Sequence, residues 1–136
     1  MTEAVDSSIA IAAILADHQA HELAEEVLGR SAATITHVAV EAYSVLTRLP
    51  PPHRLDALGA AAIIDARLPS TRVTLGADGD DDSVLRRLAR AQVSGGATYD
   101  GLIALTALEH DLELMSRDQR AARTYRALGV HFQLLT

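Results

Sequence analysis

The most regular hydrophobic pattern lies in the last third of the chain. Residues 102–108 are almost entirely apolar, which is too uniform for a surface helix and predicts a buried one. A short apolar run at 112–115 predicts a strand, a helical pattern at 119–128 ends at Gly129, and residues 130–134 alternate as a second strand. Helix, strand, helix and strand in this order predict a βαβ unit with a helix before it, and such units form parallel sheets.

Short apolar segments and helical patterns alternate along the first two-thirds of the chain. The apolar segments predict strands at residues 4–6, 33–35 and 72–75. The patterns with helical spacing predict helices at residues 9–15, 17–28, 38–49, 55–68 and 83–93. We expect Ser7 and Ser8 to cap the first of these helices. The alternation predicts an α/β protein with a mainly parallel sheet of four to five strands.

Length and composition favour one intracellular domain. The chain has 136 residues, 49% of them hydrophobic and 22% charged, so residues 1–136 are expected to form a single globular domain. The chain contains no cysteine, which excludes disulfides and thiolate chemistry. The apolar run at 9–16 is short and follows Glu3 and Asp6 instead of basic residues. We therefore expect neither a signal peptide nor a membrane span, and we expect a cytoplasmic protein.

The basic residues restrict the function further. All 12 are arginines, and the absence of lysine excludes Walker-type phosphate loops, Schiff-base enzymes and phospho-acceptor receiver domains. The net charge of −6 counts against a simple nucleic-acid binder. Residues 83–136 nevertheless carry seven arginines and five acids. These arginines either contact nucleic acid or form solvated helix faces.

Four acids stand out by their places in this pattern: Asp6, Glu41, Asp100 and Asp118. Asp6 ends one predicted strand and Asp118 follows another, and neighbouring parallel strands, about 4.8 Å apart, bring their carboxyl ends to one edge of a sheet. Asp100 lies in the first turn of the buried helix, and Glu41 lies at the edge of the apolar face of another helix. Four converging carboxylates repel one another unless a hard divalent cation such as Mg²⁺ or Mn²⁺ compensates them. Such a site activates water and holds phosphodiester oxygens.

Each acid also has a purely structural interpretation, as a turn residue, a helix cap or a surface glutamate. Two other groups of candidate ligands are weaker. The acids at 78–82 lack the glycine and glutamate of a calcium loop, and favourable charges at a helix start explain them. His18, His21 and Glu22 share one predicted helix but match no zinc-protease helix, so a solvated helix face is the simpler interpretation.

Four segments occur in a characteristic order and spacing: Val5-Asp6-Ser7-Ser8, residues 40–50, Tyr99-Asp100 with 102–104 and Ala107, and Ser116-Arg117-Asp118 followed by 125–130. Together they resemble the PIN-domain family, and in particular the VapC-type ribonuclease toxins of bacterial toxin–antitoxin pairs. The acidic quartet of that family falls on the four acids named above. Ser7 and Ser116 stand where many members have threonine, and Gly101 stands where a small side chain is usual.

The resemblance implies a single three-layer α/β/α domain with a central, mainly parallel sheet. It also implies an endoribonuclease toxin that depends on Mg²⁺ or Mn²⁺, hydrolyses RNA, usually forms a homodimer and is inhibited by a cognate antitoxin. The alanine-rich segment 57–64 is one candidate for the dimer surface, although core packing explains its composition equally well. A catalytically silent PIN-like interaction module is the alternative, and the presence of all four acids counts against it.

The same resemblance implies roles for individual residues. Three of the acids are expected to hold the cation, directly or through water: Asp6, Asp100 and Asp118. Glu41 is expected to complete the site or to help deprotonate the attacking water. Three neighbours are expected to support the site: Ser7, Ser116 and Arg117. The serines keep a hydroxyl that can orient an acid, and the arginine can contact a phosphate.

Overall fold

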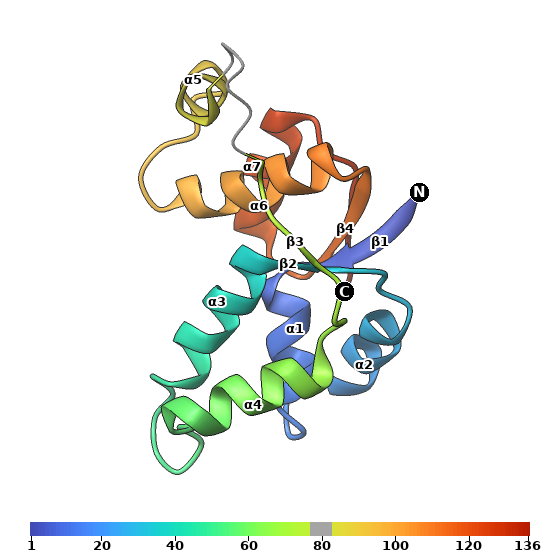
Figure 1. The fold of residues 1–136 in the computed structure, drawn as a ribbon, viewed down its shortest axis with the longest axis vertical. Helices are drawn as coiled ribbons and strands as arrows, with labels where there is room; N and C mark the ends of the chain where they lie inside the picture. The colour runs from blue at the N-terminus through green and yellow to red at the C-terminus, as the bar shows by residue number, and fades with distance from the viewer. Residues whose placement is uncertain (77–82) are drawn as a thin grey trace.

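A computed structural model describes residues 1–76 and 83–136 of the chain (Figure 1). Its strands are β1 (Thr2–Val5), β2 (Thr34–Ile35), β3 (Arg72–Val73), β4 (Leu112–Ser116) and β5 (Phe132–Leu134). Its helices are α1 (Ser7–Ile14), α2 (His21–Gly29), α3 (Thr36–Leu46), α4 (Ala57–Arg67), α5 (Val84–Arg90), α6 (Ala97–Glu109) and α7 (Gln119–Leu128). The acidic segment 78–82 lies outside the described residues.

The strands confirm the expected parallel arrangement. β4 lies between β1 and β5 and is parallel to both, and β2 pairs with β3 in a second parallel ladder. The prediction had been one sheet, whereas hydrogen bonding divides the strands into a three-stranded and a two-stranded sheet. A backbone hydrogen bond from Ala32 N–H to the Glu3 carbonyl (3.0 Å) still links the approach to β2 with the edge of β1. Because β2 and β3 have two residues each, they are too short to extend this link into a ladder.

Helices cover the strands from two sides, which gives the three-layer α/β/α arrangement. Figure 1 shows α1 to α4 on one side of the strands and α5 to α7 on the other. The small side chains of α1 allow this packing, because Ala10, Ala12 and Ala13 are completely buried among α2, α3 and β4. In the described residues no helix is long and apolar enough to cross a membrane.

α6 is buried along most of its length, which explains its nearly uniform apolar sequence. The strand β4 and the helices α3, α5 and α7 all pack against it. Its glycine has a packing role, because a Cβ on Gly101 would collide with the Leu88 side chain of α5 and lie 3.2 Å from Val93. The missing side chain therefore lets α5 approach the first turns of α6.

α7 is strongly amphipathic, as its sequence predicts. Ala121, Ala122, Thr124 and Tyr125 are buried, and the helix packs against α6 and β5. The helix ends at Gly129, which adopts the left-handed conformation with φ of 76° and confirms the expected stop. The opposite face carries exposed arginines: Arg120, Arg123 and Arg126.

Helix boundaries differ from the sequence-based expectation where side chains bind the backbone. The helix expected at 17–28 begins only at His21, because the preceding residues form turns in which the His18 ring accepts a hydrogen bond from the Ala20 N–H (3.1 Å). The helix expected at 38–49 begins two residues earlier, at Thr36, and ends at Leu46. These shifts leave Glu41 in the middle of α3.

Candidate active site

Asp6 anchors the site at the carboxyl end of β1. It follows the last residue of the strand and forms the N-cap of α1, so Asp6 and not a serine caps this helix. Its Oδ1 accepts hydrogen bonds from the backbone N–H and the hydroxyl of Ser8. Its Oδ2 accepts a hydrogen bond from the Tyr125 hydroxyl (2.8 Å). With 2% of its surface exposed, Asp6 is fixed at this place by donors on both oxygens.

Burial raises the pKa of Asp6 because it removes the carboxylate from water, while hydrogen bonds from Ser116, Ser8 and Tyr125 act in the opposite direction. The pKa of Tyr125 is raised as well, first by burial and then by the negative charge of Asp6. Tyr125 therefore stays protonated and remains a donor to Asp6 across the physiological pH range.

Asp118 occupies the corresponding place after β4. Val5 and Met115 are paired in the β1–β4 ladder, so the residues that follow the two strands emerge at the same edge of the sheet. Asp118 is the N-cap of α7, and its Oδ1 accepts hydrogen bonds from the N–H groups of Arg120 (2.9 Å) and Ala121 (3.3 Å). The expected convergence of the two strand-end aspartates thus follows from the parallel register.

Two serines tie these aspartates together. Ser116 is completely buried; its Oγ accepts a hydrogen bond from the Asp118 N–H (3.0 Å), and its hydroxyl also interacts with Asp6. The second serine is Ser8 and not the expected Ser7: Ser8 binds Asp6, and its Oγ accepts a hydrogen bond from the Arg117 N–H (2.8 Å). Ser8 is favoured because the side chain at the second helical residue turns back toward the cap, and Ser7 makes no such bond in the described structure.

Asp100 and Glu41 bring two more carboxylates to this edge. Asp100 lies in the first turn of α6 and is half-buried. Its pKa is raised to about 6, first by burial and then by the negative charges of Glu41, Asp118 and Asp6, against the positive charge of Arg120. The charges of the other three predicted acids therefore all act on Asp100.

This acidic site fits a divalent cation by its donor chemistry. The Oε2 of Glu41 is buried without a hydrogen-bond partner among the described residues, so this oxygen is left to accept a ligand. Burial raises the pKa of Asp100 most, and the negative charges of Glu41, Asp118 and Asp6 raise it further. Among the described residues, however, no three His, Asp or Glu side chains are arranged to hold a metal ion as they stand. The carboxylates supply suitable ligands, and donors from the protein already bind Asp6 and Asp118.

Arginines border the acids on the α7 side. The Nε of Arg117 is buried without a partner in the described structure, and the charge of Arg120 reaches Asp100. Arg120 and Arg123 line a cavity of about 350 Å³ between α7 and residues 91–97, with Gln92 and Thr124 among its other walls. The arginines of the chain therefore gather partly at the acidic site, which the sequence pattern alone had left undecided.

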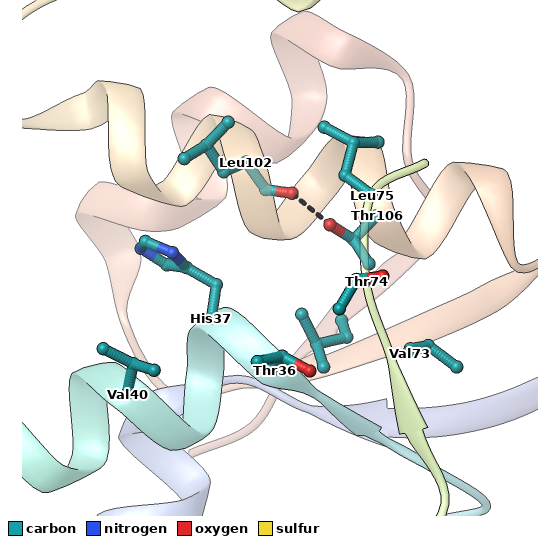
Figure 2. Close-up of a pocket in the computed structure, with 9 residues that line it drawn as sticks. Thr36, His37, Val40, Val73, Thr74, Leu75, Leu102 and Thr106 are labelled. Atoms are coloured by element: carbon teal, nitrogen blue, oxygen red, sulfur yellow. Dashed lines mark hydrogen bonds between the residues drawn. The ribbon is translucent and has the colours of Figure 1, made fainter. Parts of the chain in front are cut away.

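A second cavity lies on the α3 side of the acids. It measures about 230 Å³ and lies between the start of α3, the end of β3 and α6, and Figure 2 shows the side chains that line it. At its rim the rings of His37 and Tyr99 stack, one turn before Glu41 and one residue before Asp100. No local pattern in the sequence indicated this pair, or a role for Ser8 or Tyr125 at the site. A tyrosine next to a candidate acid was the only local signal for Tyr99.

The histidine-rich start of α2 does not form a metal site. The Nδ1 of His21 lies 2.9 Å from the Ala12 carbonyl oxygen and its Nε2 lies 3.1 Å from Glu25. The Nδ1 of His18 accepts the Ala20 N–H. Both histidines are therefore engaged in local contacts that fix the α1–α2 connection.

We expect Asp100→Asn to stabilise the cation-free protein at neutral pH. A carboxyl with a folded pKa of about 6 instead of 3.8 stabilises the fold below pH 3.8, and this contribution is lost as the pH rises through about 6. Asparagine keeps the shape without the charge. Urea unfolding in chelator should show that the stability gain of the variant over the original chain grows between these pH values. A gain that is independent of pH would contradict the electrostatic explanation.

Known proteins resemble this chain along nearly its whole length. The family profile of the PIN domain matches residues 4–127. Ribonuclease VapC40 of Mycobacterium tuberculosis, from strains CDC 1551 / Oshkosh and ATCC 25618 / H37Rv, is 41% identical over 133 residues, covering 98% of this chain and 98% of that protein. Ribonuclease VapC27 of Mycobacterium tuberculosis strain ATCC 25618 / H37Rv is 42% identical over 134 residues, covering 94% of this chain and 93% of that protein. All four acids of the site lie within the matched range.

Proposed function

This chain belongs to the PIN-domain family, in its VapC group, and on that premise we propose that it is a divalent-cation-dependent endoribonuclease, the toxin of a toxin–antitoxin pair in the cytoplasm. The observation that carries the proposal is the approach of Glu41, Asp118 and Asp6 to Asp100 at the carboxyl edge of β1 and β4, close enough for their charges to act on it. A protein that kept this fold only for packing would have no reason to bury an unpartnered carboxylate oxygen there.

The cation is Mg²⁺ or Mn²⁺, since carboxylate oxygens are hard ligands. Asp6, Asp100 and Asp118 would hold it, directly or through water. It supplies Lewis-acid activation of water and neutralises charge on a phosphodiester. The unpartnered Oε2 of Glu41 completes the ligand set or accepts a proton from the attacking water.

The remaining residues position these acids and the RNA. Ser8 and Ser116 hold Asp6 and the backbone at Arg117 and Asp118, so they fix the distance between the two strand ends. The guanidinium of Arg117 has an unpartnered Nε beside the acids and is suited to bind a phosphate oxygen.

RNA cleavage by the purified chain tests the proposal. Single-stranded and structured RNA would be incubated with Mg²⁺, with Mn²⁺ and with chelator. Cleavage that requires the cation supports the endoribonuclease. A folded, cation-binding protein that cleaves none of these RNAs supports the interaction module instead, and cleavage that survives chelator points to a contaminating nuclease.

We expect Arg123→Ala to weaken RNA binding. Arg123 lines the cavity beside α7 and forms no ion pair in the described structure, so its charge is available for a phosphate. Losing one phosphate contact should lower affinity several-fold for all RNA sequences and reduce the slope of log affinity against log salt by about one. Fluorescence anisotropy measures both, with Arg48→Ala, an exposed arginine just beyond the end of α3, as the matched control. Equal slopes of log affinity against log salt for Arg123→Ala and Arg48→Ala would contradict RNA binding at this cavity.

The chain is also proposed to pair with a cognate antitoxin protein and with a second copy of itself. The segment 57–64, interpreted from its sequence either as a dimer surface or as part of the core, has residues of both kinds. Ala60 and Ile64 face the core of the domain, whereas Leu58 on the same helix is 83% exposed. This exposed apolar face of α4 supports a protein–protein contact at α4.

A further inference from the structure

Two aromatic rings stand at the rim of the acidic site without a role in the proposed chemistry. His37 of α3 and Tyr99 of α6 stack with ring centroids 5.8 Å apart and planes within 5° of parallel. Tyr99 directly precedes Asp100, and His37 lies one helical turn before Glu41 on the same side of α3. The two helices that carry these acids therefore also carry the two rings.

Tyr99 is unusual among the few aromatic residues of the chain, which has one phenylalanine and three tyrosines. Tyr125 is completely buried and packs edge-on against Phe132, as expected for core aromatics. Tyr99 is 56% exposed, so a large part of its side chain is in contact with solvent even though it stacks on His37. An exposed ring that continues a stack offers a surface for a further planar group.

The cavity of about 230 Å³ opens beside this stack. Figure 2 shows His37 reaching from α3 toward Leu102 of α6, with Val40 on the same side and the end of β3 opposite. The hydroxyl of Thr106 donates a hydrogen bond to the Leu102 carbonyl oxygen (2.6 Å), whereas the Thr36 hydroxyl forms no such hydrogen bond in the described structure. Because drug-sized ligands occupy about 300–1,000 Å³, the cavity suits a single planar ring system with apolar faces and one polar edge.

We propose that the Tyr99–His37 stack and the adjoining cavity receive a nucleobase of the RNA next to the cleaved phosphodiester. The inference rests on the proposed ribonuclease function and deepens it. Single-stranded RNA is read mainly by bases that stack on aromatic side chains and offer their edges to polar groups. The stack lies on the two helices that also carry Glu41 and Asp100, which suits a single planar base. An apolar protein segment would instead require a longer groove.

The assignment gives Tyr99 a role in choosing the cleavage position. It binds a base and not the reacting phosphate, so its loss changes affinity and sequence preference while the acids remain in place. The hydroxyl of Tyr99 is unnecessary for stacking, so Tyr99→Phe should behave like the original chain. Tyr43, which is 37% exposed on α3 and lines a different cavity between α3 and α4, provides the matched control.

The test uses single-stranded RNA hexamers that carry 2-aminopurine at one position at a time, bound to the full chain in the Asp100→Asn background. We expect quenching of 2-aminopurine at one position, and we expect Tyr99→Leu to abolish it and to weaken binding about tenfold. Tyr99→Phe and Tyr43→Leu should retain both. In the chain with Asp100, the Tyr99→Leu change should shift the preferred cleavage positions on a long RNA.

The base site and the ribonuclease function can be contradicted independently. Quenching that depends on Tyr99, together with no RNA cleavage by the chain that retains Asp100, would support the base site and overturn the ribonuclease function. Cation-dependent cleavage with quenching, affinity and cleavage positions unchanged by Tyr99→Leu would overturn the base site and leave the function standing. Unchanged RNA binding with weakened antitoxin binding would assign the stack to the protein partner and also overturn the proposal. Thermal unfolding of each variant confirms that the fold is intact.

Discussion

Asp100→Asn is expected to reduce cation-dependent RNA cleavage by on the order of a thousandfold or more. Loss of one electrostatic or catalytic group in other enzymes costs roughly 10² to 10⁴ in rate. The charges of the other three acids act on Asp100, so removing its charge should remove a proposed ligand and weaken cation binding. The amide fits the space of the carboxyl, and the fold should survive.

The measurement compares initial rates on one RNA at saturating Mg²⁺ and Mn²⁺, together with cation affinity by calorimetry. Asp111→Asn is the matched control, because Asp111 is exposed just beyond the end of α6 and its positive φ of 53° is compatible with asparagine. We expect the control to cleave at the original rate. Full activity of Asp100→Asn would show that this acid is outside the reacting centre.

Tyr125→Phe is expected to lower the free energy of unfolding by about 1–3 kcal/mol, because a buried acceptor loses its donor. The Tyr125 hydroxyl donates to Asp6 Oδ2 across a sequence separation of 119 residues, and both side chains are buried. Without this bond one oxygen of the Asp6 carboxylate is left without the donor that compensates its burial. The pKa of Asp6 should rise further, so the loss of stability should be largest at neutral pH and smaller in acid.

Urea unfolding of the cation-free protein measures this effect. Tyr43→Phe removes a hydroxyl from an exposed tyrosine and should change stability by less than about 0.5 kcal/mol. Added Mg²⁺ should bind Tyr125→Phe more weakly as well, since Asp6 is then held by fewer contacts. Equal stability of the two tyrosine variants would mean that the hydroxyl of Tyr125 is not needed to compensate the buried carboxylate.

The sequence by itself determined the order of the elements and indicated the four candidate acids. Apolar runs of strand length and apolar positions at helical spacing are local signals, so β4, α7 and the stop at Gly129 could be placed from a few neighbouring residues. Parallel topology follows from that order, because helical crossovers between strands make the strands parallel. The place of Asp6 and Asp118 at one edge of the sheet then follows as well.

The tertiary structure alone decided which side chains serve these acids. Ser7 and Ser8 are adjacent residues of the same type, and only the geometry of the α1 cap shows that Ser8 is the one that binds Asp6. Tyr125 is distant from Asp6 in sequence, and their contact depends on how α7 packs on the sheet. The division of the strands into two sheets and the stack of His37 on Tyr99 likewise depend on packing between distant segments. Local patterns carry no information on such contacts, because each depends on the relative position of elements that only the folded chain brings together.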